Sequence, residues 1–149
     1  YALGSTKNYD DAIKLYDRIL HIEPGNVPAL LGKGYLLINS GDYLNAITIY
    51  DVVIAQEPEN EEAYTYKGIA FYRLGIFQDS VEMFDQAIAI DPNNADAWAN
   101  KGYALTKVGK LAEAVIAFDK ALELDPTNRD AEIGRILAIR TTWPSYEGE

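Results

Sequence analysis

The sequence predicts an all-α protein built from repeated pairs of helices. Residues 95–128 (ADAWANKGYALTKVGKLAEAVIAFDKALELDPTN) hold two amphipathic segments separated by Gly109. The same pattern returns at a constant spacing along the rest of the sequence. Columns with this spacing are Pro24, Pro58, Pro92 and Pro126; Gly34, Gly68 and Gly102; and Gly41, Gly75 and Gly109. An unbroken period of this length is the signature of a repeat architecture, in which each repeat is one supersecondary unit.

Start and stop signals place two helices in each repeat. Asn26, Asn60, Asn94 and Asn128 each follow a repeat proline by two positions, and asparagine is among the best helix N-caps because its side-chain oxygen accepts from unpaired backbone N–H groups. The column of Gly41 supplies a residue that readily adopts the left-handed conformation at a helix C-terminus. We therefore expect first helices at 28–40, 61–74 and 95–108, and second helices at 43–56, 77–90 and 111–124.

The residues of the repeat resemble a known family. Trp98, Gly102, Leu105, Ala114, Phe118 and Pro126 fall in the order and spacing of the tetratricopeptide repeat (TPR) pattern. The resemblance implies a right-handed α-solenoid of antiparallel helix pairs, the TPR superhelix, with three full 34-residue repeats at 27–60, 61–94 and 95–128. One departure recurs, because Lys33, Lys67 and Lys101 stand where the family has leucine. We expect these lysines to lay their methylenes on the packing surface and keep their ammonium groups in water.

The two ends carry partial repeats of the single TPR domain expected for 1–149. Residues 1–26 read mainly as a second helix at Tyr9–Glu23, preceded by the end of a first helix at Tyr1–Thr6, so we expect a fragment of a longer array. Part of the apolar stripe Tyr9, Ala12, Ile13, Tyr16, Ile19 and Leu20 should be uncovered. Residues 129–142 read as a C-terminal capping helix whose outer face is partly polar. Residues 143–149 form a tail, with Trp143 folded back over Ile136 and Ile139.

Charge and composition exclude several classes of partner. The net charge is −10, whereas nucleic-acid and anionic-lipid binding require a basic surface. No apolar run approaches the roughly 20 residues of a membrane span. The chain has no cysteine, which fits a reducing compartment, and we expect a cytoplasmic location.

The sequence offers no catalytic, cofactor or metal site. His21 is the sole histidine, and one imidazole near a helix C-terminus is a stabilising feature rather than part of a metal cluster. Gly32-Lys33-Gly34 lacks the spacing of a phosphate-binding loop. The aspartate column Asp17, Asp51, Asp85 and Asp119 reads as solvated outer surface. We therefore expect a protein that is not an enzyme and binds no cofactor.

The resemblance also implies a binding surface, since the first helices of TPR domains line a concave groove that holds an extended peptide or a helix. Tyrosine is dense there, with 11 in the whole chain, and such rings can anchor a partner or pack between adjacent first helices. The expected groove residues are Tyr35, Tyr66, Ile69, Tyr72, Arg73, Asn100, Tyr103 and Lys107, flanked by Leu31, Ile38 and Thr106.

One TPR subclass binds the acidic C-terminal tails of chaperones through a clamp of lysine, arginine and asparagine. The matching positions here are Leu31, Tyr35, Tyr66, Asp96 and Asn100, and only Asn100 has the required chemistry. The sequence thus argues against a chaperone tail as ligand. The favoured hypothesis is a non-catalytic protein-interaction scaffold. The alternatives are a structural element that self-associates through its exposed terminal helices and a regulatory segment of a larger protein or enzyme.

Overall fold

The computed structural model describes residues 2–142, with side chains from residue 8 onward, and all regular structure in that part of the chain is helical. The helices are α1 (Ala2–Ile22), α2 (Val27–Ser40), α3 (Tyr43–Gln56), α4 (Glu61–Arg73), α5 (Phe77–Ile90), α6 (Ala95–Val108), α7 (Leu111–Leu124) and α8 (Arg129–Thr142). The helix pairs predicted for the three full repeats are confirmed, with ends that differ by at most one position. The predicted fold class is likewise confirmed.

The asparagine caps form as predicted. The side-chain oxygen of Asn26 accepts from the backbone N–H of Ala29 at 3.0 Å, and Asn60 accepts from Ala63 at 2.9 Å. Asn94 and Asn128 make the same bonds at 3.1 Å and 3.0 Å at the starts of α6 and α8. Each bond satisfies a backbone donor that the helix cannot pair itself.

Glycines end the first helices as predicted. Gly41, Gly75 and Gly109 have φ values of 86°, 79° and 87°. At the end of α2 the N–H of Gly41 donates to the carbonyl of Ile38, and the N–H of Asp42 donates to that of Leu37. The left-handed residue thus satisfies two otherwise unpaired carbonyls and turns the chain into α3.

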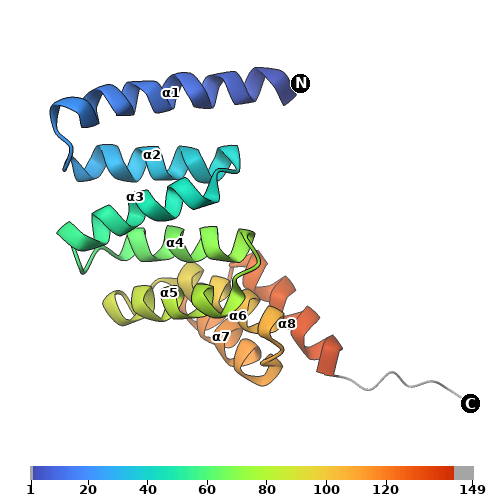
Figure 1. Ribbon diagram of the computed structural model, residues 1–149. Helices are drawn as coiled ribbons and strands as arrows, with labels where there is room; N and C mark the ends of the chain where they lie inside the picture. The colour runs from blue at the N-terminus through green and yellow to red at the C-terminus, as the bar shows by residue number, and fades with distance from the viewer. Residues whose placement is uncertain (1, 143–149) are drawn as a thin grey trace, which may run out of the picture. The chain divides into compact units, whose positions relative to one another are not determined.

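The chain divides into two compact units, Tyr1–Ile76 with α1 to α4 and Phe77–Glu149 with α5 to α8. In the first unit each helix runs antiparallel to the one before it (Figure 1). The division falls inside the repeat 61–94, between its two helices. The expected arrangement of the chain as a single domain stays a prediction.

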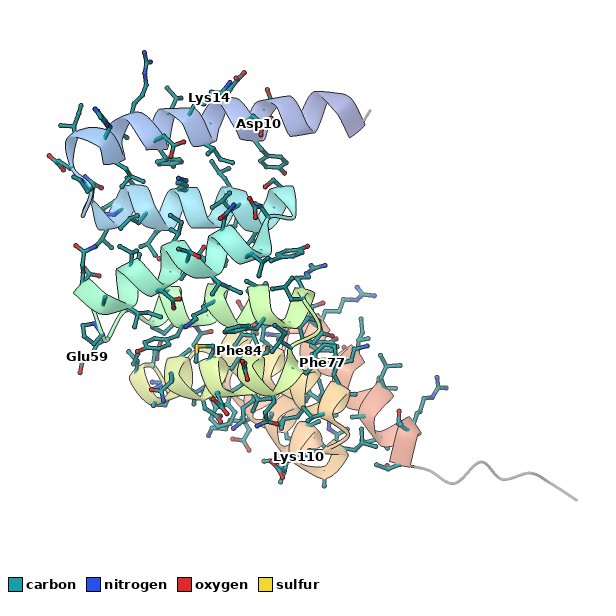
Figure 2. The ribbon with its side chains drawn as sticks, in the orientation of Figure 1. Asp10, Lys14, Glu59, Phe77, Phe84 and Lys110 are labelled. Carbon is teal, nitrogen blue, oxygen red and sulfur yellow. The ribbon has the colours of Figure 1, made fainter. Side chains whose placement is uncertain are left out.

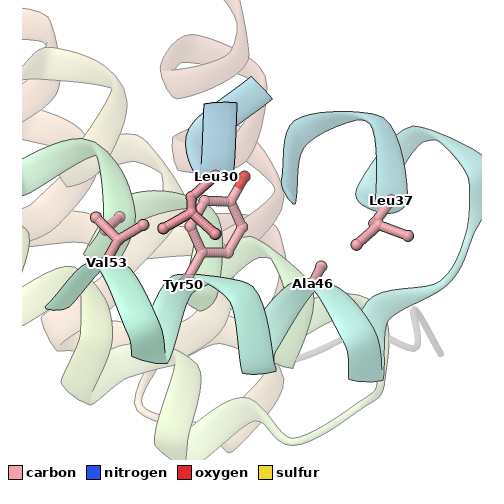
Figure 3. Close-up of a cluster of buried hydrophobic side chains, with 6 residues drawn as sticks. Leu30, Leu37, Ala46, Tyr50 and Val53 are labelled. Carbon is pink, nitrogen blue, oxygen red and sulfur yellow. The ribbon is translucent and has the colours of Figure 1, made fainter. Parts of the chain in front are cut away.

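The core of the first unit forms around a buried tyrosine. Tyr50, Val53 and Ala46 of α3 pack with Leu30 and Leu37 of α2, and Figure 3 shows the Tyr50 ring extending toward Leu30. A Cβ placed on Gly34 would lie 2.6 Å from Cζ of Tyr50. The glycine therefore makes room for the aromatic ring of the paired helix.

The N-terminal helix differs from the prediction. We expected a first helix to end near Thr6 and a second to begin at Tyr9, but α1 runs without interruption from Ala2 to Ile22. The glycine column that ends the other first helices falls at Lys7. Since this position lacks the residue that favours the left-handed conformation, nothing in the sequence stops the helix there.

The C-terminal helix is more apolar on its outer face than a capping helix requires. Ile133, Ile136 and Leu137 are 45%, 46% and 50% exposed. Their spacing of three and four positions places them on one face of α8. The predicted tail and the predicted contact of Trp143 lie outside the described residues.

Candidate peptide-binding surface

The predicted groove residues fall in both units. Tyr35 lies on α2, and Tyr66, Ile69, Tyr72 and Arg73 lie on α4, all in the first unit. Asn100, Tyr103 and Lys107 lie on α6 in the second. The structure therefore presents two first-helix faces, one in each unit. Their union in a single groove stays a prediction.

The structure brings three tyrosines of the first unit together. The rings of Tyr35 and Tyr66 meet edge to face, with centroids 5.6 Å apart and an interplanar angle of 80°. Tyr66 in turn stacks on Tyr50, at 5.9 Å and 13°. Tyr50 is fully buried, Tyr66 is half-buried and Tyr35 is 47% exposed. The three rings thus lead from the core to the surface.

Burial and nearby carboxylates affect the phenols. Burial raises the pKa of Tyr66, and the negative charge of Glu62 raises it further. The pKa of Tyr50 is raised more strongly, again chiefly by burial. The Tyr50 hydroxyl is buried without a hydrogen-bond partner in the structure, so it carries a desolvation cost that no bond offsets.

Tyr103 has a different environment in the second unit. Its ring meets that of Phe118 edge to face, at 5.1 Å and 81°. Its hydroxyl donates to the backbone carbonyl of Asp130 at 2.6 Å. Tyr103 therefore fastens α6 to α7 and α8, which is the packing alternative that the sequence left open for these rings.

The remaining predicted residues make a mixed border. Ile69, Tyr72 and Asn100 are half-buried, whereas Arg73 and Lys107 are exposed at the C-terminal ends of α4 and α6. The flanking residues Leu31 and Ile38 are partly buried against the core of the first unit. Among the groove residues predicted for the first unit, Arg73 alone is basic.

An acidic hollow lies at the start of α4. It has a volume of about 720 Å³ and is lined by Glu57, Pro58, Glu59, Asn60, Glu61 and Glu62. Figure 2 shows Glu59 at the turn that joins α3 to α4. Glu61 accepts from the Thr65 hydroxyl at 2.7 Å, and Glu57 accepts from the side-chain amide of Asn60 at 2.8 Å. This cluster was not among the predicted sites, although the run of glutamates is visible in the sequence.

The lysine and aspartate columns, which the sequence placed separately, pair with each other. In three pairs a lysine Nζ lies 2.6 Å from an aspartate Oδ1: Lys33 with Asp17, Lys67 with Asp51, and Lys101 with Asp85. In the fourth pair Arg135 contacts Asp119. We call these four pairs the inter-repeat ladder, because each joins a first helix to the second helix of the preceding repeat. The sequence prediction for these lysines did not include a carboxylate partner, and their side chains are 21%, 16% and 22% exposed. A signal existed, since both columns recur once in every repeat and keep a constant separation from each other.

Within residues 2–142, no helix is long and apolar enough to cross a membrane. In the same part of the chain no three histidine, aspartate or glutamate side chains are grouped as a metal site would need.

Comparison with known proteins agrees with this architecture. Two family models, both described as tetratricopeptide repeat, match residues 5–70 and 65–129. No curated protein sequence matches the chain. Among solved structures, MamA is 26% identical with a TM-score of 0.85, over 92% of this chain and 80% of that one.

Two similar structures contain peptides. The first TPR domain of Spaghetti (RPAP3), bound to the HSP90 peptide SRMEEVD, is 26% identical with a TM-score of 0.75, over 77% of this chain and 91% of that one. The second TPR domain of human RPAP3, in complex with the HSP70 peptide SGPTIEEVD, is 28% identical with a TM-score of 0.70, over 72% and 89%. The regular repeat, the confirmed helix pairs and these matches show that the chain belongs to the tetratricopeptide repeat family.

Proposed function

We propose that this chain is a non-catalytic protein-interaction module that binds an extended peptide or a helix of a partner on its first-helix faces. The observation that carries the proposal is the edge-to-face pair of Tyr35 and Tyr66, with Tyr35 47% exposed. The pair is preformed by packing on the buried Tyr50. A partner would therefore bind to aromatic rings that are already ordered in the folded chain, so binding would not carry the entropy cost of ordering them.

The similar structures support the class of ligand. Two of them hold short peptides from HSP90 and HSP70. Those peptides end in acidic residues, whereas this chain has Tyr35, Tyr66 and Asp96 at three of the positions that match a chaperone-tail clamp. The proposal therefore keeps a peptide or helix as ligand and disfavours an acidic chaperone tail.

The experiment is affinity capture from the lysate of the source cell, followed by direct titration of the captured protein with the purified chain. Tyr35→Ala is the test variant, because Tyr35 is exposed and its loss leaves the core intact. Ile116→Ala is the matched control, since Ile116 is 65% exposed on the second helix α7. We expect Tyr35→Ala to weaken binding about tenfold, as for a central aromatic anchor, and the control to leave it unchanged. Equal binding by both variants would contradict the proposal.

A second candidate function is self-association through the terminal helices. On α1, Leu15, Ile19 and Ile22 are 60%, 42% and 81% exposed, and they form one apolar stripe. The apolar stripe predicted from the sequence also included Ile13 and Tyr16. Ile13 packs on the core and Tyr16 lies where a Cβ on Gly32 would meet it, so both are structural.

Sedimentation tests the second candidate. If α1 mediates assembly, Ile22→Lys should reduce the mass at high concentration while leaving the helical signal unchanged. A monomer mass at every concentration would exclude it. A third candidate function is that of a regulatory segment of a larger protein, located in the cytoplasm. The neighbouring sequence of the parent gene would test it.

A further inference from the structure

The face of α2 and α4 combines exposed aromatic area with a cluster of carboxylates. Glu62 is exposed and precedes Tyr66 by four positions, so the two side chains lie on the same face of α4, one turn apart. Glu59, also exposed, lines the same hollow as Glu62 at the start of the helix, together with Glu57 and Glu61. The aromatic pair and the carboxylates are therefore parts of one continuous surface.

The basic residues of α2 and α4 are either paired with aspartates or distant from the glutamates. Lys33 of α2 and Lys67 of α4 are held at 2.6 Å by Asp17 and Asp51 in the inter-repeat ladder. Arg73 lies three turns after Glu62 on the same helix, which is about 16 Å along the axis and beyond the screening length of about 8 Å at physiological salt. The helix dipole places about half a positive charge at the start of α4, so the local charge stays negative.

From these contacts we propose that the face of α2 and α4 binds a partner segment in which a lysine or arginine stands beside a large apolar residue. The apolar side chain lies on the rings of Tyr35 and Tyr66, and the cation reaches Glu62 and Glu59. A cation near a tyrosine face also gains from the ring quadrupole. The inference deepens the proposed function and rests on it, because it names the chemistry of the ligand for the same surface.

The partner's orientation follows from the two ends of α4. The basic residue of the segment lies toward the start of the helix, at the glutamates. Arg73 lies at its end, where an acidic residue of the segment is favoured over a basic one. Charge at the border mainly sets orientation and association rate, while the aromatic anchors supply most of the affinity.

A selection from a library of random dodecapeptides, displayed against the purified intact chain, tests the inference. We expect the enriched peptides to carry lysine or arginine next to leucine, phenylalanine or tryptophan. The best of them, made synthetically, is then titrated against Glu59→Gln/Glu62→Gln and against Tyr35→Ala. Each variant should weaken binding about fivefold to tenfold. The double variant should also reduce the salt dependence of binding.

The controls separate a specific surface from general attraction. Glu82→Gln/Glu123→Gln removes the same charge from exposed positions of α5 and α7 and should leave binding unchanged. Equal weakening by both double variants would overturn the inference in favour of non-specific attraction to an acidic chain. Enrichment of acidic or uncharged peptides would overturn it while leaving the proposed function intact. If no peptide is enriched, the proposed function itself fails.

Discussion

Tyr35 in the first unit and Tyr103 in the second occupy the same position of the repeat, yet their environments differ. Tyr103 packs on Phe118 and donates to the Asp130 carbonyl, whereas Tyr35 is 47% exposed. The residue facing them on the next first helix accounts for the difference. It is Gly134 in the second unit, where a Cβ would lie 3.0 Å from Cζ of Tyr103. In the first unit it is Tyr66, whose ring occupies that space and stacks on Tyr50.

The comparison teaches that a repeat position has no fixed role. One tyrosine is a packing element and the other is a candidate anchor for a partner, and a residue on the adjacent helix decides which. The sequence-based list of groove residues treated the two alike. Only the first is available to a ligand without loss of a core contact.

Truncation of the two rings should separate them most clearly. Tyr103→Ala removes ring packing and a hydrogen bond and should cost about 2–4 kcal/mol, near the range for large buried side chains. Tyr35→Ala should cost under about 1 kcal/mol, as for an exposed residue. Urea unfolding, with hydrogen exchange of the α2 and α6 amides to localise the effect, measures both. Equal costs would contradict the assignment of different roles.

Filling the space beside Tyr103 gives the next largest effect. A Cβ at Gly134 would meet Cε1 and Cζ of Phe118, whose ring is buried, well inside normal contact distance. Although alanine is favoured over glycine in helices by about 1 kcal/mol, overpacking should make Gly134→Ala destabilising by about 1–3 kcal/mol. The same change in a Phe118→Leu background should cost less. A stabilised Gly134→Ala variant would show that the second unit has room to adjust.

Removing single hydroxyls should have opposite effects in the two units. Tyr50→Phe deletes a buried group without a hydrogen-bond partner and should stabilise the first unit by about 1 kcal/mol. Tyr103→Phe breaks the bond to Asp130 and should destabilise the second unit by about 1 kcal/mol. Thermal unfolding of both variants compares the signs. Two losses of similar size would mean that Tyr50 has a hydrogen-bond partner in solution.

Alkaline pH should weaken the first unit through the same residue. Burial raises the pKa of Tyr50 above its ordinary value of about 10. The folded state therefore holds the phenol proton more tightly than the unfolded state, so stability is fully present below about pH 10 and falls as the pH rises above it. The fall approaches about 1.4 kcal/mol for each pH unit when one group is responsible. Unfolding measured from pH 9 to 11.5 should show a shallower decline in Tyr50→Phe than in the parent chain.

The inter-repeat ladder should contribute equally to the stability of both units. It therefore serves as a reference that is independent of the difference between Tyr35 and Tyr103. Asp51→Asn and Asp85→Asn each break a pair of 2.6 Å whose aspartate is about half exposed. Each should cost about 0.5 kcal/mol, with the loss reduced in roughly 1 M salt. Matched denaturation at low and high salt tests this. A large cost in one unit alone would show that the rungs are not equivalent.

The sequence predicted the fold because its strongest signals are local. Asn26 and Gly41 set helix ends through bonds to near neighbours in the chain, and such geometry follows from residue type alone. The continuous α1 was not predicted, because the repeat pattern places a helix end near Thr6, whereas Lys7 stands where the other repeats have the glycine that ends the first helix.

The candidate surface was less predictable because its side chains depend on contacts between helices. The roles of Tyr35 and Tyr103 follow from Tyr66 and Gly134, each of which lies on the next first helix along the chain. The periodicity of the lysine and aspartate columns is visible in the sequence. Their proximity in space is not, so the inter-repeat ladder was not predicted. The unpaired Tyr50 hydroxyl has no sequence signal, since the same column holds phenylalanine in two other repeats.

The inter-repeat ladder has a consequence for how such a chain can change in length. Each complete repeat carries a lysine that fits the aspartate before it and an aspartate that fits the cation after it. Deleting or duplicating any window of one repeat length leaves every cation of the ladder at the same sequence separation from an aspartate. The joints are therefore interchangeable, and a gene that gained or lost one repeat would need no compensating mutation at the new junction to restore its charge pairing.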